Sequence, residues 1–262
     1  MFSSLNDLEP MDALLAAGFR FGEKGTHTSR TMMLTELTDL LAAVPADGNR
    51  AAYASAIIED NVLGKQTTAT RRLTNQRLGE LYGLDPRLPL FRVLRRLWVI
   101  DEPGRPLLAL LCALARDPLL RATAPAVIEL PLGAELVRAG FLDVVRQEVG
   151  SRLNDSILDK VARNAGSTWS QSGHLQGRVR KIRQRVTPTA GSVAMALWMG
   201  TLQGLAGERL LECDWARVLD RSGGGLIEFV LQAKQLGLMQ ARIGGGVVEL
   251  DASRLSALPL GV

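Results

Sequence analysis

The chain has very few of the residues that most often carry chemistry in proteins. Its 262 residues include only two histidines and two cysteines. His27 and His174 lie far apart, so a zinc site would need ligands from distant segments, and we expect no metal. Cys112 and Cys213 occur in two separate apolar, helix-forming segments. This favours buried free thiols in a reducing compartment, with a disulfide as the alternative.

Aromatic side chains and long apolar runs are also scarce. Aromatic residues make up 5% of the chain, which argues against a platform that stacks the bases of single-stranded nucleic acid. The most apolar stretch, residues 192–205, is interrupted by polar residues and glycines, so it predicts a buried helix rather than a membrane span. The first residues, MFSSLNDLEPMD, lack the basic and apolar parts of a signal peptide. We therefore expect a cytoplasmic protein with no membrane partner.

No catalytic motif is evident. Residues 22–26 (GEKGT) resemble a phosphate loop but lack the Walker spacing and its Gly-Lys-Ser/Thr ending. The serines near Trp169 and His174 have no partnered acid in the sequence. Asp155 and Asp159 could suggest a metal-dependent nuclease, but acids in the first turn of a helix simply favour its dipole. The sequence predicts no enzyme, no cofactor and no small-molecule substrate.

What the chain does contain is helical periodicity over most of its length. Prolines at positions 45, 86, 103, 118 and 188 separate the predicted helices. These helices span about residues 30–43, 50–60, 67–82, 88–99, 106–116, 134–149, 155–165, 174–187, 190–205, 208–220 and 225–236.

Strand signals are scarce before residue 237. Beyond it, residues 239–243 and 247–250 flank three glycines and predict a short hairpin. Two helices followed by this hairpin resemble a winged helix. We therefore predict a mainly α, multi-helix fold with a small C-terminal, winged-helix-like β-hairpin. We divide it into residues 1–117, with a helix-turn-helix candidate, and residues 118–262, with a basic helix and the winged-helix-like end.

The positive charge of the chain is concentrated in one region. Residues 151–187 contain eight basic residues and two acids, a charge of +6, whereas the whole chain carries +4. Residues 178–185 read RVRKIRQR, and a helix over 174–187 would place its apolar side chains in one narrow stripe, with cations around the rest. Such a surface suits phosphates. The first candidate set for DNA contact is Arg178, Arg180, Lys181, Arg183 and Arg185. The alternative is a solvated helix whose arginines pair with acids elsewhere in the fold.

A second candidate lies in the N-terminal half. The predicted helices 50–60 and 67–82 are joined by a turn containing Gly64, which is the order of a helix-turn-helix. Thr68 shares one face of the second helix with arginine, asparagine and glutamine side chains, the types that bind base edges. The second set is Lys65, Arg71, Arg72, Asn75 and Gln76, with Asn75 and Gln76 as base readers. An ordinary polar helix face remains the alternative.

The predicted C-terminal winged helix has a different character. Its second helix exposes Glu228, Gln232, Lys234 and Gln235, which together carry no net charge. It is better suited to packing or to protein contact than to DNA.

Two stretches resemble the BrxA family, small helical accessory proteins of BREX phage-defence systems. They are residues 56–73 (AIIEDNVLGKQTTATRRL) and residues 158–175 (LDKVARNAGSTWSQSGHL). The resemblance implies a NusB-like helical core, DNA binding without catalysis, and action beside other defence proteins. This chain departs from the family pattern in its basic segment 178–185 and in residues 190–262.

Together these patterns predict a non-enzymatic protein that binds double-stranded DNA mainly through phosphate contacts, in a bacterial phage-defence system. Two alternatives remain open. One is a scaffold that docks larger defence proteins, and the other is an RNA-binding helical protein.

Overall fold

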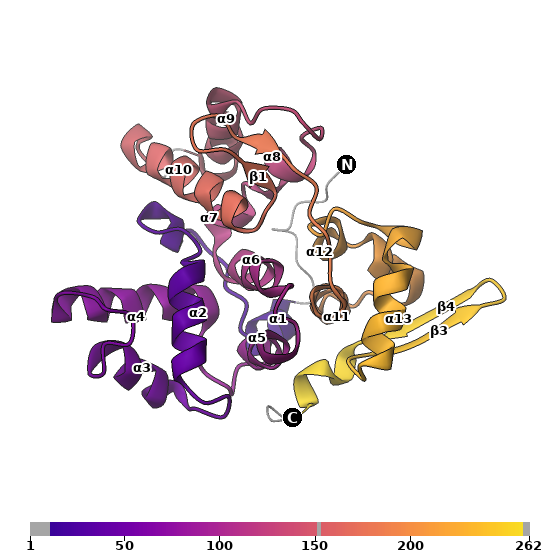
Figure 1. Cartoon of the computed structure of the whole chain (residues 1–262). Helices are drawn as coiled ribbons and strands as arrows, with labels where there is room; N and C mark the ends of the chain where they lie inside the picture. The colour runs from indigo at the N-terminus through magenta and orange to yellow at the C-terminus, as the bar shows by residue number, and fades with distance from the viewer. Residues whose placement is uncertain (1–10, 151–152, 259–262) are drawn as a thin grey trace.

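The protein is mainly helical, as its periodicity predicts. A computed structural model describes residues 11–150 and 153–258 (Figure 1). The N-terminal stretch used above to argue against a signal peptide lies largely outside these residues, as does Arg152 of the basic region. The α-helices are α1 (Met11–Ala17), α2 (Leu34–Ala43), α3 (Arg50–Ile58), α4 (Thr68–Tyr82), α5 (Pro89–Ile100), α6 (Arg105–Arg116), α7 (Pro118–Arg121), α8 (Ala124–Ile128), α9 (Arg138–Val149), α10 (Asp155–Gln171), α11 (Ala190–Leu202), α12 (Asp214–Arg217) and α13 (Ile227–Gln235).

Short elements complete the described chain. The 3₁₀ helices are η1 (Thr26–Thr28), η3 (Gly207–Glu212), η4 (Gly223–Leu226) and η5 (Ser253–Ala257). The strands are β1 (Leu175–Gln176), β2 (Ile182–Arg183), β3 (Gln240–Gly244) and β4 (Val247–Asp251), and they form two antiparallel hairpins.

Local sequence explains where several helices begin. Asn49, Thr67, Asn154 and Thr189 precede α3, α4, α10 and α11, and each side chain accepts a hydrogen bond from a backbone N–H of the first turn. These residues satisfy donors that have no partner within the helix. Proline stands in the first turn of α5 and of α6, where its missing N–H is not needed.

The core is built around two almost fully buried helices, α6 and α11. Residues 107–116 of α6 and 191–200 of α11 are all buried. Helix α6 packs against α4, α5 and α11, and α11 packs against α12 and α13, so they join the N-terminal and C-terminal helices (Figure 1). Helices buried on every side read as continuous apolar runs, which explains why residues 192–205 look so apolar in the sequence.

One apolar cluster extends from Leu14 to Leu255, on both sides of the predicted division at residue 117. A second, smaller cluster lies between α7, α9 and α10 and consists of Leu119, Val145, Val149, Leu158 and Val161. The division itself stays a prediction.

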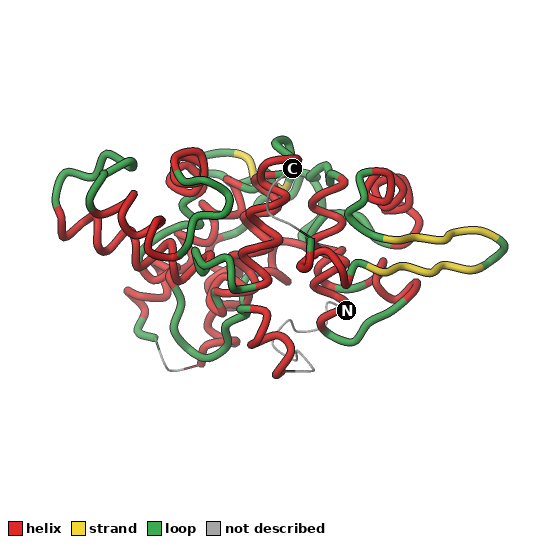
Figure 2. The backbone as a smooth tube through the Cα atoms, turned by 90° about the horizontal axis from the view of Figure 1, so that it is seen from below, coloured by secondary structure: helices red, strands yellow, loops and turns green. Residues whose placement is uncertain are grey.

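The predicted C-terminal hairpin is confirmed. Strands β3 and β4 pair from Gln240 with Asp251 to Gly244 with Val247. The hairpin follows α13 and projects from the body of the protein in both views (Figures 1 and 2). The predicted helix 208–220 is shorter and divided, because η3 ends at Glu212 and α12 begins at Asp214.

The predicted basic helix over residues 174–187 is wrong. This segment forms the hairpin β1–β2, followed by a stretch without regular secondary structure to Thr189. The reason is tertiary. The backbone of residues 133–136 donates to and accepts from residues 181–183 through three hydrogen bonds of 2.8–3.0 Å, and these replace the helical ones. Gly173 and Gly177 adopt positive φ on either side of β1, which a helix does not permit.

Cys112 and Cys213 are both free and buried, as the sequence favoured. No helix within the described residues is long and apolar enough to cross a membrane. In the same part of the chain, no group of three or more histidine, cysteine, aspartate or glutamate side chains is placed to hold a metal ion.

Candidate nucleic-acid interface

The hairpin β1–β2 carries the most basic segment of the sequence as a tight loop. Leu175 pairs with Arg183 and Gln176 with Ile182, so residues 177–181 form the connection. Gly177 has φ +107°, and a Cβ atom there would collide with the carbonyl oxygen of Arg180. Only glycine fits this turn without a shift of the backbone.

A buried ion pair fixes the base of this hairpin. Arg183 is 2% exposed, and its guanidinium binds the carboxylate of Asp220 from the segment after α12. Its Nη1 lies 3.0 Å from Asp220 Oδ2, and its Nε donates to the carbonyl oxygen of Val127 at 2.8 Å. Arg183 therefore holds the hairpin in the fold and does not reach solvent.

Four cationic side chains line one groove between α9, α10 and the 177–181 loop. We call it the basic groove, and its lining residues are Leu136, Arg138, Phe141, Ala162, Arg163, Gly166, Ser167, Arg178, Val179 and Lys181. Its volume is about 360 Å³. Helix α10 packs against both α9 and β1 (Figure 1). Among the residues that the structure describes, no carboxylate lines the groove, so this lining has a single sign of charge.

The cations of the groove are only partly neutralised. Arg138 and Arg163 share one carboxylate, that of Asp159 on α10. Lys181 Nζ donates to the hydroxyl oxygen of Ser170 at 2.8 Å and has no carboxylate partner among the described residues. Partial burial lowers the pKa of Lys181, because an ammonium group loses hydration there. Arg178 is exposed and bonds to none of the described residues. The groove therefore keeps an excess of positive charge, which favours binding of an anion.

The five residues of the first predicted set, from Arg178 to Arg185, do not share one role in the structure. Arg178 and Lys181 line the basic groove. Arg180 points to Glu135, with Nη2 2.7 Å from its carboxylate. Arg185 is exposed without a bond to the described residues, and Arg183 is the buried anchor.

The second predicted set is mostly engaged within the fold. Lys65 pairs with Glu36 at 3.0 Å, and Arg71 donates to the carbonyl oxygens of Lys65 and Ile58. Asn75 accepts from Arg50 at 3.1 Å.

The two remaining members of the second set, Arg72 and Gln76, are exposed on α4. Gln76 donates to Glu80, and Arg72 makes no bond within the described chain. Arg71 and Asn75 therefore bind α4 to α3, and Arg72 is the cation of this set without a partner among the described residues.

The sequence pointed to the hairpin side of the groove and missed part of the opposite wall. Arg163 lies in the basic region but was not singled out, and Arg138 lies outside that region altogether. A helical wheel of residues 155–165 would show Asp159 and Arg163 one turn apart. Nothing in the sequence alone places Arg138 beside them.

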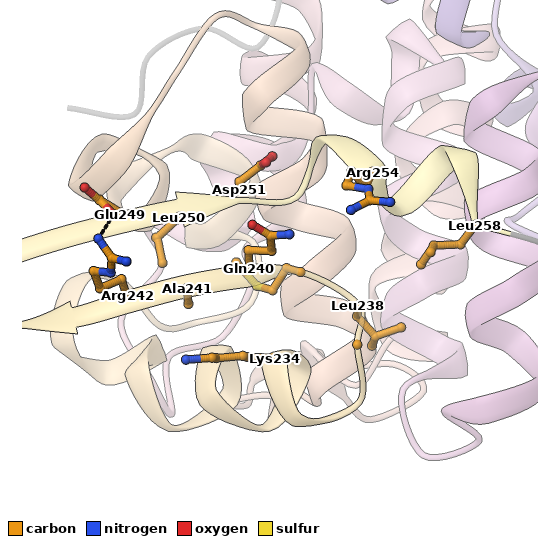
Figure 3. Close-up of a pocket in the computed structure, with 12 residues that line it drawn as sticks. Lys234, Leu238, Gln240, Ala241, Arg242, Glu249, Leu250, Asp251, Arg254 and Leu258 are labelled. Carbon is orange, nitrogen blue, oxygen red and sulfur yellow. Dashed lines mark ion pairs between the residues drawn. The ribbon is translucent and has the colours of Figure 1, made fainter.

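A second groove of about 750 Å³ lies beside the C-terminal hairpin (Figure 3). Its charged lining is mixed: Lys234, Arg242 and Arg254 against Glu249 and Asp251. Arg242 and Glu249 pair across the two strands at 3.6 Å, as Figure 3 shows. Opposite charges in one groove favour a phosphate less than the basic groove does.

One buried cluster has the bonding order of a hydrolytic triad. His27 Nδ1 lies 2.8 Å from Asp117 Oδ2, and His27 Nε2 lies 2.8 Å from Thr168 Oγ1. Burial acts to raise the pKa of Asp117, but His27 and backbone N–H donors outweigh it and hold that pKa below its usual value.

This cluster is sealed from solvent. His27 and Thr168 are fully buried, and Thr168 Oγ1 also accepts the N–H of Met32. With no access for a substrate, the cluster ties η1, α7 and α10 together.

No family model fits the sequence, and no curated protein matches it. The resemblance to the BrxA family therefore stays a prediction.

Proposed function

We propose that this is a non-enzymatic cytoplasmic protein that binds double-stranded DNA chiefly through phosphate contacts. The observation that carries the proposal is the basic groove, where Arg138, Arg163, Arg178 and Lys181 meet without a lining carboxylate. Each phosphate that a protein cation neutralises releases condensed counterions, which favours binding.

Two exposed cations of the basic segment are open to phosphates. Arg178 stands on the hairpin loop and Arg185 on the stretch that follows it, and both are free of partners among the described residues. Four phosphate contacts would give a log–log salt slope of roughly −3.6. Base reading by Asn75 has less support, because its side-chain oxygen already accepts from Arg50.

The resemblance of residues 56–73 and 158–175 to the BrxA family supports a role in a BREX-like phage-defence system, beside other defence proteins. The genes that neighbour this one distinguish that role from one in transcription.

A second candidate is a scaffold that binds an acidic partner protein. It is favoured by apolar side chains at the edge of the groove, because Val179 is 93% exposed and Val137 is 64% exposed. Structured RNA would use the same cations as DNA, but it presents a different groove shape. Competition between duplex DNA and structured RNA separates these ligands.

The test is fluorescence anisotropy with a random duplex of about 30 base pairs, titrated across salt. Exchanging both Arg178 and Lys181 for glutamine (R178Q/K181Q) should flatten the salt slope by about two units. The control is R87Q, because Arg87 is also a solvent-exposed cation but lies elsewhere and pairs with Asp85. An unchanged slope in the double variant, or no binding at low salt, contradicts the proposal.

A further inference from the structure

The basic groove has an apolar floor as well as cationic walls. Phe141 and Ala162 are buried at its base, and Leu136 is half-buried beside them. Val179 stands on the loop at the edge of the groove with almost its whole side chain in solvent. A volume of about 360 Å³ suits one small ligand. A surface that only follows a DNA backbone needs no such floor.

The cations in the groove exceed what one phosphodiester requires. Asp159 is shared by Arg138 and Arg163, which leaves Lys181 and Arg178 without a carboxylate among the described residues. A phosphodiester carries one negative charge, whereas a phosphate monoester carries about 1.5 to 2 near neutral pH. The charge of the groove therefore favours a monoester over a diester.

The side chain of Lys181 lies against the backbone of α10 at Gly166. Gly166 on α10 has no side chain, and a Cβ there would lie 3.4 Å from Cδ and Cε of Lys181, so the lysine stem lies close along the helix. Its ammonium group then reaches Ser170, one helical turn farther along α10. This holds one cation in place before any ligand binds, which lowers the cost of ordering it.

We propose that the basic groove binds a nucleoside 5′-phosphate, with the phosphate among the four cations and the sugar and base over Phe141 and against Val179. The source of this group is either a free nucleotide or the 5′-phosphorylated end of a DNA strand. The DNA source rests on the proposed function, and the nucleotide source does not.

The first experiment measures binding of deoxyadenosine 5′-monophosphate by calorimetry, with deoxyadenosine and inorganic phosphate as comparisons. We expect the nucleotide to bind more tightly than either part. R178Q/K181Q should weaken it by about tenfold or more, because two charge-assisted contacts are lost. Val179→Ser should lower the affinity for the nucleotide and leave the affinity for inorganic phosphate unchanged. R87Q should change neither affinity.

Three results would overturn the inference. In the first, deoxyadenosine binds as tightly as its monophosphate. In the second, R178Q/K181Q leaves nucleotide binding intact. In the third, the nucleotide does not bind at all. Equal effects of Val179→Ser on nucleotide and on inorganic phosphate would also overturn the placement of the base. Val179 and Arg178 are exposed, so Val179→Ser and the Arg178→Gln change are expected to fold normally. Lys181 is half-buried, so chemical denaturation checks the fold of R178Q/K181Q before binding is measured.

The second experiment separates the sources. Three duplexes of one sequence are compared: one with 5′-phosphates, one with 5′-hydroxyls, and one closed at both ends by hairpin loops. Tighter binding of the phosphorylated duplex, with competition by the nucleotide, supports the DNA end as ligand. Nucleotide binding without any DNA binding supports the free nucleotide and removes the proposed function. Equal binding of all three duplexes without competition keeps the proposed function and removes this inference.

Discussion

At the scale of single residues, arginines of the same basic segment have opposite roles. Arg178 faces solvent at the groove, whereas Arg183, five residues later, is buried against Asp220. Asp220 Oδ2 also accepts the backbone N–H of Val186 at 2.8 Å, so it holds both β2 and the stretch that follows. A buried arginine with a satisfied carboxylate is a structural residue, and its removal leaves an uncompensated charge.

Replacing Arg183 by glutamine should therefore act on stability. We expect the free energy of unfolding to fall by about 3–5 kcal/mol, because Asp220 would stay buried without its partner. Chemical denaturation measures this. The exposed Arg185→Gln is the control and should change stability by less than about 0.5 kcal/mol. A stable R183Q with a flattened salt slope would show that Arg183 contacts DNA after all.

His174 gives the protein a defined response to acid. Burial lowers its pKa from 6.5 to about 4, because the charged imidazolium loses hydration. Nδ1 lies 2.9 Å from Ser172 Oγ, and Nε2 lies 2.7 Å from the carbonyl oxygen of Val218. The unfolded chain takes up this proton near pH 6.5 and the folded chain only near pH 4. The stabilising contribution is thus complete above pH 6.5 and is lost as pH falls toward 4.

The expected loss is about 1.4 kcal/mol per pH unit within that window. Burial raises the pKa of Asp214 to about 6, which stabilises the folded state as pH falls and offsets part of the loss. The difference between the native chain and His174→Gln isolates the histidine. Urea denaturation from pH 7 to 4.5 should show that this difference shrinks, and a constant difference would contradict the assigned shift.

At the scale of elements, the β1–β2 hairpin depends on one glycine. Gly177→Ala should distort the loop, because the new Cβ meets the Arg180 carbonyl at a positive φ. Arg178 and Lys181 flank the distortion, so we expect DNA affinity to fall together with a loss of stability of about 1 kcal/mol or more. Anisotropy and denaturation measure the two effects.

The control for this variant is Gly140→Ala in α9, where no atom lies within 4 Å of the new Cβ and φ is not positive. It should stabilise the helix by up to about 1 kcal/mol. Full DNA affinity in Gly177→Ala would mean that the loop geometry does not matter for binding.

The polar face of helix α4 also serves the fold rather than a ligand. Its polar face was expected to contact base edges, and most of that face instead bonds within the fold. Arg71 satisfies the carbonyl of Ile58 at the end of α3, and Asn75 binds Arg50 at its start. Residue types suited to base edges are equally suited to helix ends.

At the scale of the whole molecule, α6 and α11 form one core for both halves. Because the apolar cluster from Leu14 to Leu255 is continuous, we expect residues 11–258 to unfold in one cooperative step. Calorimetry should give a van't Hoff enthalpy equal to the calorimetric one. Two resolved transitions would instead support independent domains divided near residue 117.

The helical class, most of the helices and the C-terminal hairpin could be predicted from the sequence. These follow from local causes: apolar periodicity, capping residues such as Thr67 and Asn154, prolines between helices, and the glycine turn 245–246. Such interactions join residues close in the chain, so the sequence shows them directly.

The conformation of residues 174–187, and the choice of which cations remain free, depend on tertiary contacts. The apolar residues there do recur at helical spacing. Hydrogen bonds to residues 133–136 and the ion pair with Asp220 nevertheless stabilise a hairpin. The same long-range packing brings Arg138 of α9 to the groove and hides Arg183. Partners that lie tens of residues away leave no local signal, and they decide which charges can meet a ligand.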